Sequence, residues 1–125
     1  LQKDGKGVWQ ISGALTRHAL RYSYITNLSQ AITPVTETLQ KAFPAKNPLP
    51  ELEQVSIEVA KTVETSLGSL GEVSVDFGLD EQGSIWIIEL NAKPMKNLFA
   101  ALGEPQLIKN IYEQPLNYAR NLART

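Results

Sequence analysis

The sequence predicts an α+β fold, in which an antiparallel sheet is covered by helices. Two patterns carry this prediction. Residues 73–90 contain two apolar runs joined by a polar turn, which indicates a β-hairpin. Residues 50–70 place apolar side chains at every third or fourth position, which indicates a long amphipathic helix. Since 42% of the 125 residues are hydrophobic, we expect one domain, or part of one.

Composition excludes several classes of protein. The 12 basic and 13 acidic residues give a net charge of −1, so no broad basic surface is expected and nucleic acid is not a predicted partner. No run approaches the roughly 18 apolar residues of a membrane span. The absence of cysteine fits a reducing compartment such as the cytoplasm. Because the chain opens at Leu1 without a start signal, we expect a fragment of a longer protein.

The N-terminal part predicts a turn at residues 3–7, followed by one long strand over about residues 8–19. Arg17 continues the apolar face of that strand. Two interpretations are open. Arg17 is either the solvated end of a buried stripe, or a phosphate ligand, because a planar guanidinium suits bidentate contact with phosphate.

The middle of the chain predicts a loop and then helices. Residues 21–34 are polar with little periodicity, which is typical of a loop, and a short helix follows to about Phe43. Gly68 and Gly71 are both plausible ends for the long helix 50–70. After the hairpin, residues 107–112 predict one helix and Pro115 the start of another. The long helix is expected to bury one face against the sheet, through Val55, Val59 and Val63.

The hairpin contains the candidate metal-binding residues. Residues 73–79 alternate apolar and polar, so Asp76 is expected to point away from the core face. The return run 85–90 is apolar almost throughout, as in a strand covered on both sides, and Pro94 stops it. In that strand four residues are predicted to share one face: Ile85, Ile87, Glu89 and Asn91.

The register of the hairpin decides whether the acidic residues meet. A two-residue loop at 81–82 or a four-residue loop at 80–83 gives the same pairing, with Asp76 opposite Ile87 and Glu89 as a diagonal neighbour about 7–8 Å away. Asp76, Glu89 and Asn91 could then converge on a hard cation. Mg²⁺ takes one or two carboxylates and completes its shell with water and phosphates, so a nucleotide is the natural partner.

A solvated hairpin with an acidic face is the alternative. Glu89 counts against it, because an ionised carboxylate inside so apolar a run needs a cation or a donor if it is buried.

The sequence also resembles a known family. The motif VDFGLDEQGSIWIIELNAKP at residues 75–94 resembles the closing motif of the ATP-grasp fold, and most closely the ATP-grasp proteins of the YheC/YheD type, associated with the endospore coat. Upstream, LQKDGKGVWQISGALTRHA and YITNLSQA resemble a strand pair and an Asn-bearing loop of that family, and downstream YARNLA resembles its closing helix. The likeness covers most of the chain, and residues 31–60 match only in kind.

The resemblance implies the C-terminal lobe of an ATP-grasp domain, with ATP and Mg²⁺ as cofactors. Relatives follow the Asn-Leu of the loop with a Gly-rich turn, and this chain has Gln30-Ala31-Ile32 instead, which places loop closure in question. The roles that the resemblance implies are metal binding for Asp76, Glu89 and Asn91, phosphate contact for Asn27, Arg17 and Lys93, and adenine contact for Ile88.

The implied activity is ATP- and Mg²⁺-dependent ligation. A carboxylate substrate of unknown identity would form an acyl phosphate, which an amine, a thiol or a similar nucleophile captures. Because such a site lies between two lobes, we expect the missing N-terminal lobe to be a partner and the fragment alone to be inactive. Two alternatives stay open: a nucleotide-binding or degenerate module without turnover, and a spore-coat assembly protein. The expected location is the cytoplasm, with spore-coat association implied by the resemblance.

Overall fold

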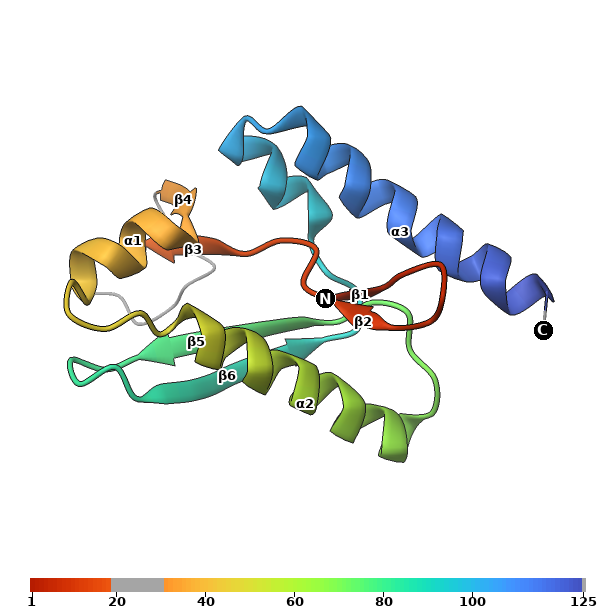
Figure 1. Ribbon diagram of the computed structural model, residues 1–125, viewed down its shortest axis with the longest axis horizontal. Helices are drawn as coiled ribbons and strands as arrows, with labels where there is room; N and C mark the ends of the chain where they lie inside the picture. The colour runs from red at the N-terminus through yellow and green to blue at the C-terminus, as the bar shows by residue number, and fades with distance from the viewer. Residues whose placement is uncertain (19–30, 125) are drawn as a thin grey trace.

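The computed structural model describes residues 1–18 and 31–124 and confirms the α+β class (Figure 1). Within these residues the strands form three antiparallel pairs, β1 with β2, β3 with β4 and β5 with β6, and helices pack around them. The elements in order are β1 (Gln2–Lys3), β2 (Trp9–Gln10), β3 (Leu15–His18), β4 (Ala31–Pro34), α1 (Val35–Ala42), α2 (Leu49–Leu67), β5 (Ser74–Leu79), β6 (Ile85–Asn91), the 3-10 helix η2 (Lys96–Leu102) and α3 (Pro105–Arg124).

The β1–β2 hairpin lies between α2 and α3 (Figure 1). Its turn confirms the prediction for residues 3–7. The Asp4 N–H donates to the Val8 carbonyl at 3.0 Å, and the Asp4 carboxylate accepts from the N–H groups of Lys6 and Val8. Gly7 adopts a positive φ of 78°, which glycine reaches without steric cost. The turn therefore follows from its local sequence.

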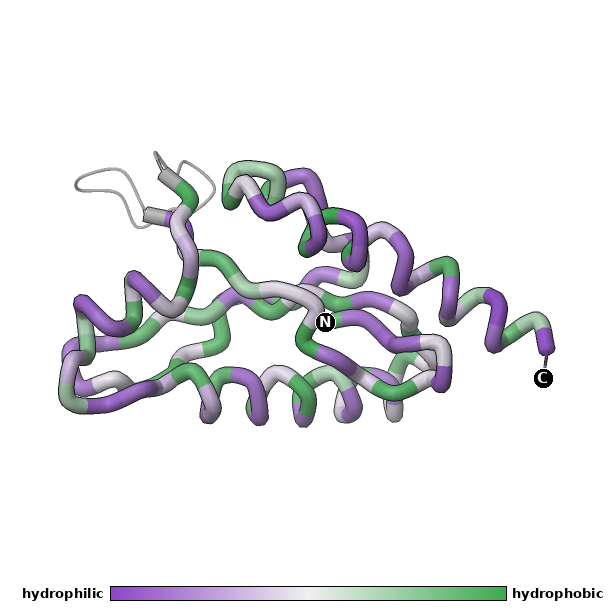
Figure 2. Tube along the Cα trace, turned by 45° about the horizontal axis from the view of Figure 1, so that its top comes forward, coloured by the Kyte–Doolittle hydropathy of each residue, from purple (hydrophilic) through white to green (hydrophobic). Residues whose placement is uncertain are grey.

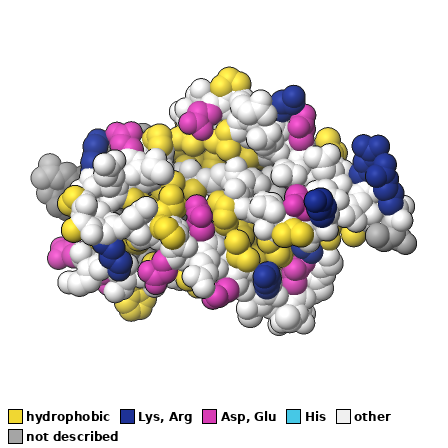
Figure 3. Space-filling model, viewed as in Figure 1, with side chains coloured by type: hydrophobic (Ala, Val, Ile, Leu, Met, Phe, Trp, Pro, Cys, Tyr) yellow, Lys and Arg dark blue, Asp and Glu magenta, His cyan; other side chains and the backbone are white. Residues whose placement is uncertain are grey.

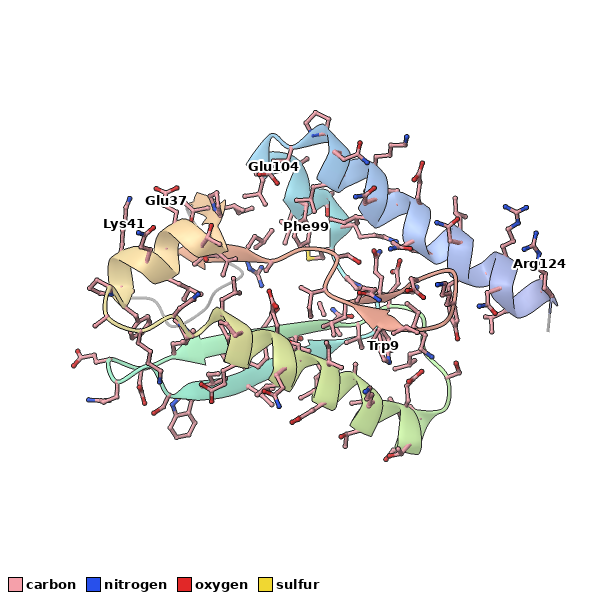
Figure 4. All side chains as sticks on the ribbon, viewed as in Figure 1. Trp9, Glu37, Lys41, Phe99, Glu104 and Arg124 are labelled. Carbon is pink, nitrogen blue, oxygen red and sulfur yellow. The ribbon has the colours of Figure 1, made fainter. Side chains whose placement is uncertain are left out.

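The single long strand predicted over residues 8–19 is wrong. The segment forms two short strands that belong to different sheets, because β2 pairs with β1 whereas β3 pairs with β4. Gly13 lies between them, and a Cβ atom there would be only 2.7 Å from Cε1 of Phe99 in η2. Phe99 is labelled in Figure 4 on the helix that lies over this segment. The close approach of Phe99 thus requires a glycine where the chain changes sheets.

β4 is a strand that the sequence did not predict. The prediction of a loop over residues 21–34 is wrong for its last four residues, whose polar surroundings show little periodicity, and residues 21–30 lie outside the described part of the chain. Residues 31–34 pair along their whole length with β3, and Arg17 lies opposite Ile32. The short helix predicted after Pro34 is confirmed as α1.

The long predicted helix is confirmed as α2, and it ends at Gly68, whose φ is 88°. Its buried stripe is not the predicted one. Leu52, Ser56 and Ala60 are buried, and Ala60 is fully so. Polar and apolar residues alternate along α2 in Figure 2, as expected for a helix with one buried side. Small side chains at the contact let the helix approach the strands closely, which leaves the predicted valines half-buried: Val55, Val59 and Val63.

The two helices predicted after the hairpin are also wrong, since α3 runs unbroken through Pro115. Proline has no N–H to donate to the carbonyl four residues earlier, which is that of Ile111. The side-chain amide of Gln2 donates to this carbonyl instead, at 2.6 Å. A residue from the other end of the chain thus replaces the missing hydrogen bond inside the helix.

The core lies where β2, α2 and the start of β5 meet. Trp9, Ala60 and Val73 form its buried centre, and Val75 packs against them. The Val75 face of the β5–β6 hairpin is therefore the core side. No helix in the described part of the chain is both long and apolar enough to cross a membrane.

Candidate metal and nucleotide site

The turn of the β5–β6 hairpin is one residue longer than the longest loop predicted. Leu79 pairs with Ile85, which leaves a five-residue loop over residues 80–84. The Asp80 carboxylate accepts from the N–H groups of Gln82 and Ser84 at 3.0 and 2.9 Å. The Ser84 N–H does most to hold the pKa of Asp80 below its ordinary value, so this carboxylate stays ionised and fixes the loop.

A β-bulge then changes the register a second time. Phe77 pairs with Ile87, but Asp76 pairs with Glu89, so Ile88 is an extra residue on β6. The predicted pairing of Asp76 with Ile87 is therefore wrong. The loop length and the bulge each shift the register by one residue, and together they move Glu89 from a diagonal position to the position directly opposite Asp76.

The bulge also changes which residues share a face. Because directly paired residues point to the same side of a sheet, Asp76 and Glu89 lie together, and Asn91 follows two residues later on their face. Ile85 and Ile87 do not share this face as predicted, since the bulge separates them from Glu89. The structure thus places the three predicted metal ligands on one face. The bulge that does so could not be predicted from the alternating pattern.

An apolar surface adjoins the acidic pair. Ile88 lies on the same side as Asp76, because a Cβ atom at Gly78 would be 3.3 Å from Cδ1 of Ile88. Trp86 lies opposite Gly78 and donates through its indole N–H to Asp80 at 3.3 Å. The exposed fractions of Ile88 and Trp86 are 57% and 64%. A flat ligand can therefore reach both side chains.

Arg17 comes to this face from β3. Its Nη2 donates to Oδ2 of Asp76 at 3.2 Å, and the exposed fractions of the two side chains are 20% and 36%. The sequence interpretation of Arg17 as a free solvated head is wrong, since its guanidinium is paired. The sequence could not reveal this partner, because 59 residues separate Arg17 from Asp76.

The other predicted site residues are less constrained. Oδ1 of Asn91 accepts from the Lys93 N–H at 2.8 Å, which fixes the amide at the end of β6. Lys93 and Glu89 are exposed, and no described residue forms an ion pair with either of them. Asn27 lies outside the described residues.

The prediction that residues 85–90 form a strand covered on both sides is wrong, because every residue of β6 after Ile85 is exposed. Burial of Glu89 therefore no longer counts against a solvated hairpin.

The donor set fits a magnesium ion in number and type. Among residues 1–18 and 31–124 no group of three or more His, Cys, Asp or Glu could hold a metal. Two carboxylates and one amide oxygen are nevertheless what Mg²⁺ takes from proteins when water and phosphates complete its shell. The Asn91 oxygen can accept the Lys93 N–H and still offer a second lone pair.

A separate hollow of about 430 Å³ lies at the other end of the molecule. It is lined by Gly5, Asn117, Asn121 and two arginines of α3, one of which, Arg124, is labelled in Figure 4. Basic side chains gather there on the face seen in Figure 3, whereas acidic and basic side chains are mixed over the rest of that face. None of these residues belongs to the predicted site.

Two curated proteins of Bacillus subtilis (strain 168) are similar to the chain. It is 26% identical to the endospore coat-associated protein YheD over 103 residues, which cover 78% of the chain and 22% of that protein. It is 25% identical to the endospore coat-associated protein YheC over 126 aligned positions, which cover 98% of the chain and 34% of that protein. The chain thus spans about a fifth to a third of these relatives. No solved structure matches.

The family described as YheC/D like ATP-grasp matches residues 1–122, which is nearly the whole chain. The matched region includes the paired carboxylates on β5 and β6, the amide of Asn91 and the arginine of β3. The chain therefore belongs to the YheC/D-like ATP-grasp family.

Proposed function

We propose that the β5–β6 hairpin is the metal- and phosphate-binding face of an ATP-dependent ligase domain. Membership of the ATP-grasp family supports a ligase-type, ATP-binding domain. The observation that carries the finer proposal is the direct pairing of Asp76 with Glu89. Like charges directly opposite each other destabilise a sheet, and Arg17 pairs with Asp76 alone, whereas a cation shared by both carboxylates would offset both charges.

The roles of the residues follow from their positions. Asp76 and Glu89 would hold Mg²⁺, and Asn91 would add an amide oxygen from the same face. When bound, the metal neutralises negative charge on the phosphates during transfer. Arg17 and Lys93 would contact the remaining phosphate oxygens, and Asn27 would do so from the loop. Arg17 suits this role because its planar guanidinium binds phosphate oxygens in pairs.

The reaction would join a carboxylate to a nucleophile. A substrate carboxylate oxygen attacks the γ-phosphorus, and the bond to the bridging oxygen breaks to release ADP. An amine or thiol then attacks the carbonyl carbon of the acyl phosphate, loses its proton and displaces phosphate. The residues of this chain orient the triphosphate for in-line attack and offset its charge, which are the main demands of phosphoryl transfer.

The apolar surface beside the carboxylates would receive the base. Ile88 and Trp86 lie on the acidic face, nearer to the hairpin turn than the pair Asp76 and Glu89. A nucleotide along β6 would therefore place its adenine on these side chains and its phosphates at the carboxylates. The length of the hairpin is sufficient, since about 3.4 Å per residue gives roughly 10 Å from Trp86 to Glu89.

Calorimetry with ATP·Mg²⁺ tests the proposal in the natural protein that carries this chain. Glu89→Gln should lower the affinity at least about tenfold, because one of two charged ligands is lost. Glu81→Gln is the matched control, since Glu81 is exposed in the hairpin loop and should leave the affinity unchanged. Equal losses from both substitutions, or none from Glu89→Gln, would contradict the proposal.

A role in assembly is the second candidate, and one observation favours it. β6 exposes large apolar side chains on both faces of the hairpin, Trp86 and Ile88 beside Asp76 and Glu89, and Ile87 and Leu90 on the opposite face. Exposed apolar side chains can mark interaction sites, and the two similar proteins are named as endospore coat-associated. If assembly is the function, Leu90→Ser should abolish association with the coat while Glu89→Gln leaves it intact. The ligase proposal predicts that Glu89→Gln abolishes turnover.

A further inference from the structure

Arg17 forms an ion pair with Asp76, whose carboxylate the proposed metal site needs. Its guanidinium donates to Oδ2 of Asp76 at 3.2 Å, and the exposed fraction of the Arg17 side chain is only 20%. The ion pair joins β3 of one sheet to β5 of another. The ion pair thus links two sheets, and Arg17 is the less exposed of its two partners.

The position of Glu89 shows what this contact does for the fold. Glu89 lies directly opposite Asp76, is exposed and has no ion-pair partner among the described residues. Two carboxylates in such a position repel each other. The charge of Arg17 offsets this repulsion in the state that the structure shows.

We infer that Arg17 neutralises Asp76 before the metal binds, gives way to the metal and then pairs with phosphate. Arg17 thereby makes metal binding depend on the nucleotide. The inference rests on the proposed function, because it concerns the same site. A divalent cation at Asp76 and the guanidinium cannot both stay within a few ångströms of one carboxylate without strong repulsion. Arg17 must therefore leave Asp76 when the site is loaded.

The arriving phosphates supply the new partner for Arg17. They carry negative charge to the same face, and a guanidinium forms paired hydrogen bonds with phosphate oxygens. Without phosphate, the displaced guanidinium would have lost its partner while still partly buried, and this cost opposes the binding of the metal alone. Metal and phosphate are thus coupled, and each raises the affinity for the other.

The test measures Mn²⁺ binding, without nucleotide, in the natural protein that carries this chain. Arg17→Gln should raise the affinity for Mn²⁺ alone about fivefold to tenfold, because the competing charge is gone. The same substitution should lower the affinity for ATP·Mg²⁺, because a phosphate ligand is gone. Opposite changes in the two affinities are the signature of exchange, since a merely structural role would lower both.

Three further variants make the result decisive. Arg120→Gln removes an exposed arginine of α3 and should change neither affinity. Arg17→Lys keeps the charge and should leave Mn²⁺ binding close to that of the original protein. Glu89→Gln should weaken Mn²⁺ binding if the proposed metal site exists.

The outcomes separate the inference from the function on which it rests. If Glu89→Gln weakens Mn²⁺ binding but Arg17→Gln leaves it unchanged or weaker, the exchange is overturned and the metal site stands. If Glu89→Gln has no effect on Mn²⁺ binding, both the metal site and the exchange are overturned. Circular dichroism of each variant identifies any loss of affinity that comes from unfolding.

Discussion

Two hairpins of this protein have the same kind of turn but differ in their exposure to solvent. In each, an aspartate at the start of the turn accepts from the backbone N–H groups two and four residues later, at Asp4 and at Asp80. Each turn has a glycine with positive φ three residues after the aspartate, 78° at Gly7 and 79° at Gly83. The β1–β2 hairpin is enclosed by helices, whereas β6 is exposed along most of its length.

The carboxylates beside the two hairpins differ in the same way. Glu64 of α2 accepts from Lys3, from the Trp9 indole at 3.0 Å and from the Leu70 N–H at 2.9 Å. The ammonium of Lys3 also lies 5.1 Å from the centre of the Tyr118 ring. Asp76 and Glu89 have one described cationic partner between them, Arg17. Glu64 thus has three donors from the chain and stabilises the fold, whereas Glu89 is exposed and has no ion-pair partner among the described residues.

The largest predicted effect is on stability, at the enclosed hairpin. Glu64→Ala should lower the free energy of unfolding by about 2–4 kcal/mol, because Lys3 would keep its charge at 8% exposure without a counter-ion. Chemical denaturation monitored by circular dichroism measures the change. A loss below about 1 kcal/mol would show that Glu64 is no more structural than a surface carboxylate.

The pH dependence of stability should come from the same carboxylate. Burial alone would raise the pKa of Glu64, yet the hydrogen bonds from Lys3, the Leu70 N–H and Trp9 outweigh it and hold the pKa below its ordinary value. A lowered pKa adds stability above the ordinary value of 4.5, and this stability disappears as pH falls through the folded-state pKa. Melting curves of the original chain should therefore approach those of Glu64→Gln as the pH falls below 4.5 and through the lower pKa of folded Glu64. Parallel curves at all pH values would contradict this assignment.

The two turns should respond equally to one substitution. Gly7→Ala and Gly83→Ala each force a side chain into a left-handed conformation, which costs about 1 kcal/mol. A Cβ atom at either position meets only ordinary contacts, at 3.6 Å from Tyr118 and 3.5 Å from Phe43, so strain is the only cause expected. Unequal losses in thermal unfolding would show that the turns are not equivalent.

The smallest effect on stability is expected at the open hairpin. Glu89→Gln should raise the free energy of unfolding slightly, by up to about 0.5 kcal/mol, because it removes a charge directly opposite Asp76. The same denaturation experiment measures it. A clear loss of stability would mean that Glu89 has a structural partner in the folded protein, and would remove the contrast with Glu64.

The sequence was sufficient for features that depend on neighbouring residues. The turn at Asp4, helices α1 and α2 and the α+β class follow from periodicity and turn residues, and the structure confirms them. Contacts between distant residues account for the errors. Position 13 is a glycine because Phe99 lies close to it, and α3 continues through Pro115 because Gln2 donates to the Ile111 carbonyl. Neither contact can be predicted from a local sequence pattern.

The candidate site also has features that depend on neighbouring residues and features that depend on distant ones. The residue types at Asp76, Glu89 and Asn91 were recognisable from the motif, and their common face is confirmed. Their register was wrong, because a bulge leaves no mark in an apolar run such as residues 85–90. The partner of Arg17 was also not predictable, since it depends on how one sheet packs on another.

The position of a bound metal would show directly whether Asp76 and Glu89 hold it together. Crystals of the natural protein that carries this chain, grown with Mn²⁺ and a non-hydrolysable ATP analogue, would give an anomalous signal at the metal. We expect a peak within about 2.5 Å of carboxylate oxygens of both Asp76 and Glu89, with Arg17 turned to the phosphates. A nucleotide bound with its metal elsewhere, and Arg17 still paired with Asp76, would contradict this prediction.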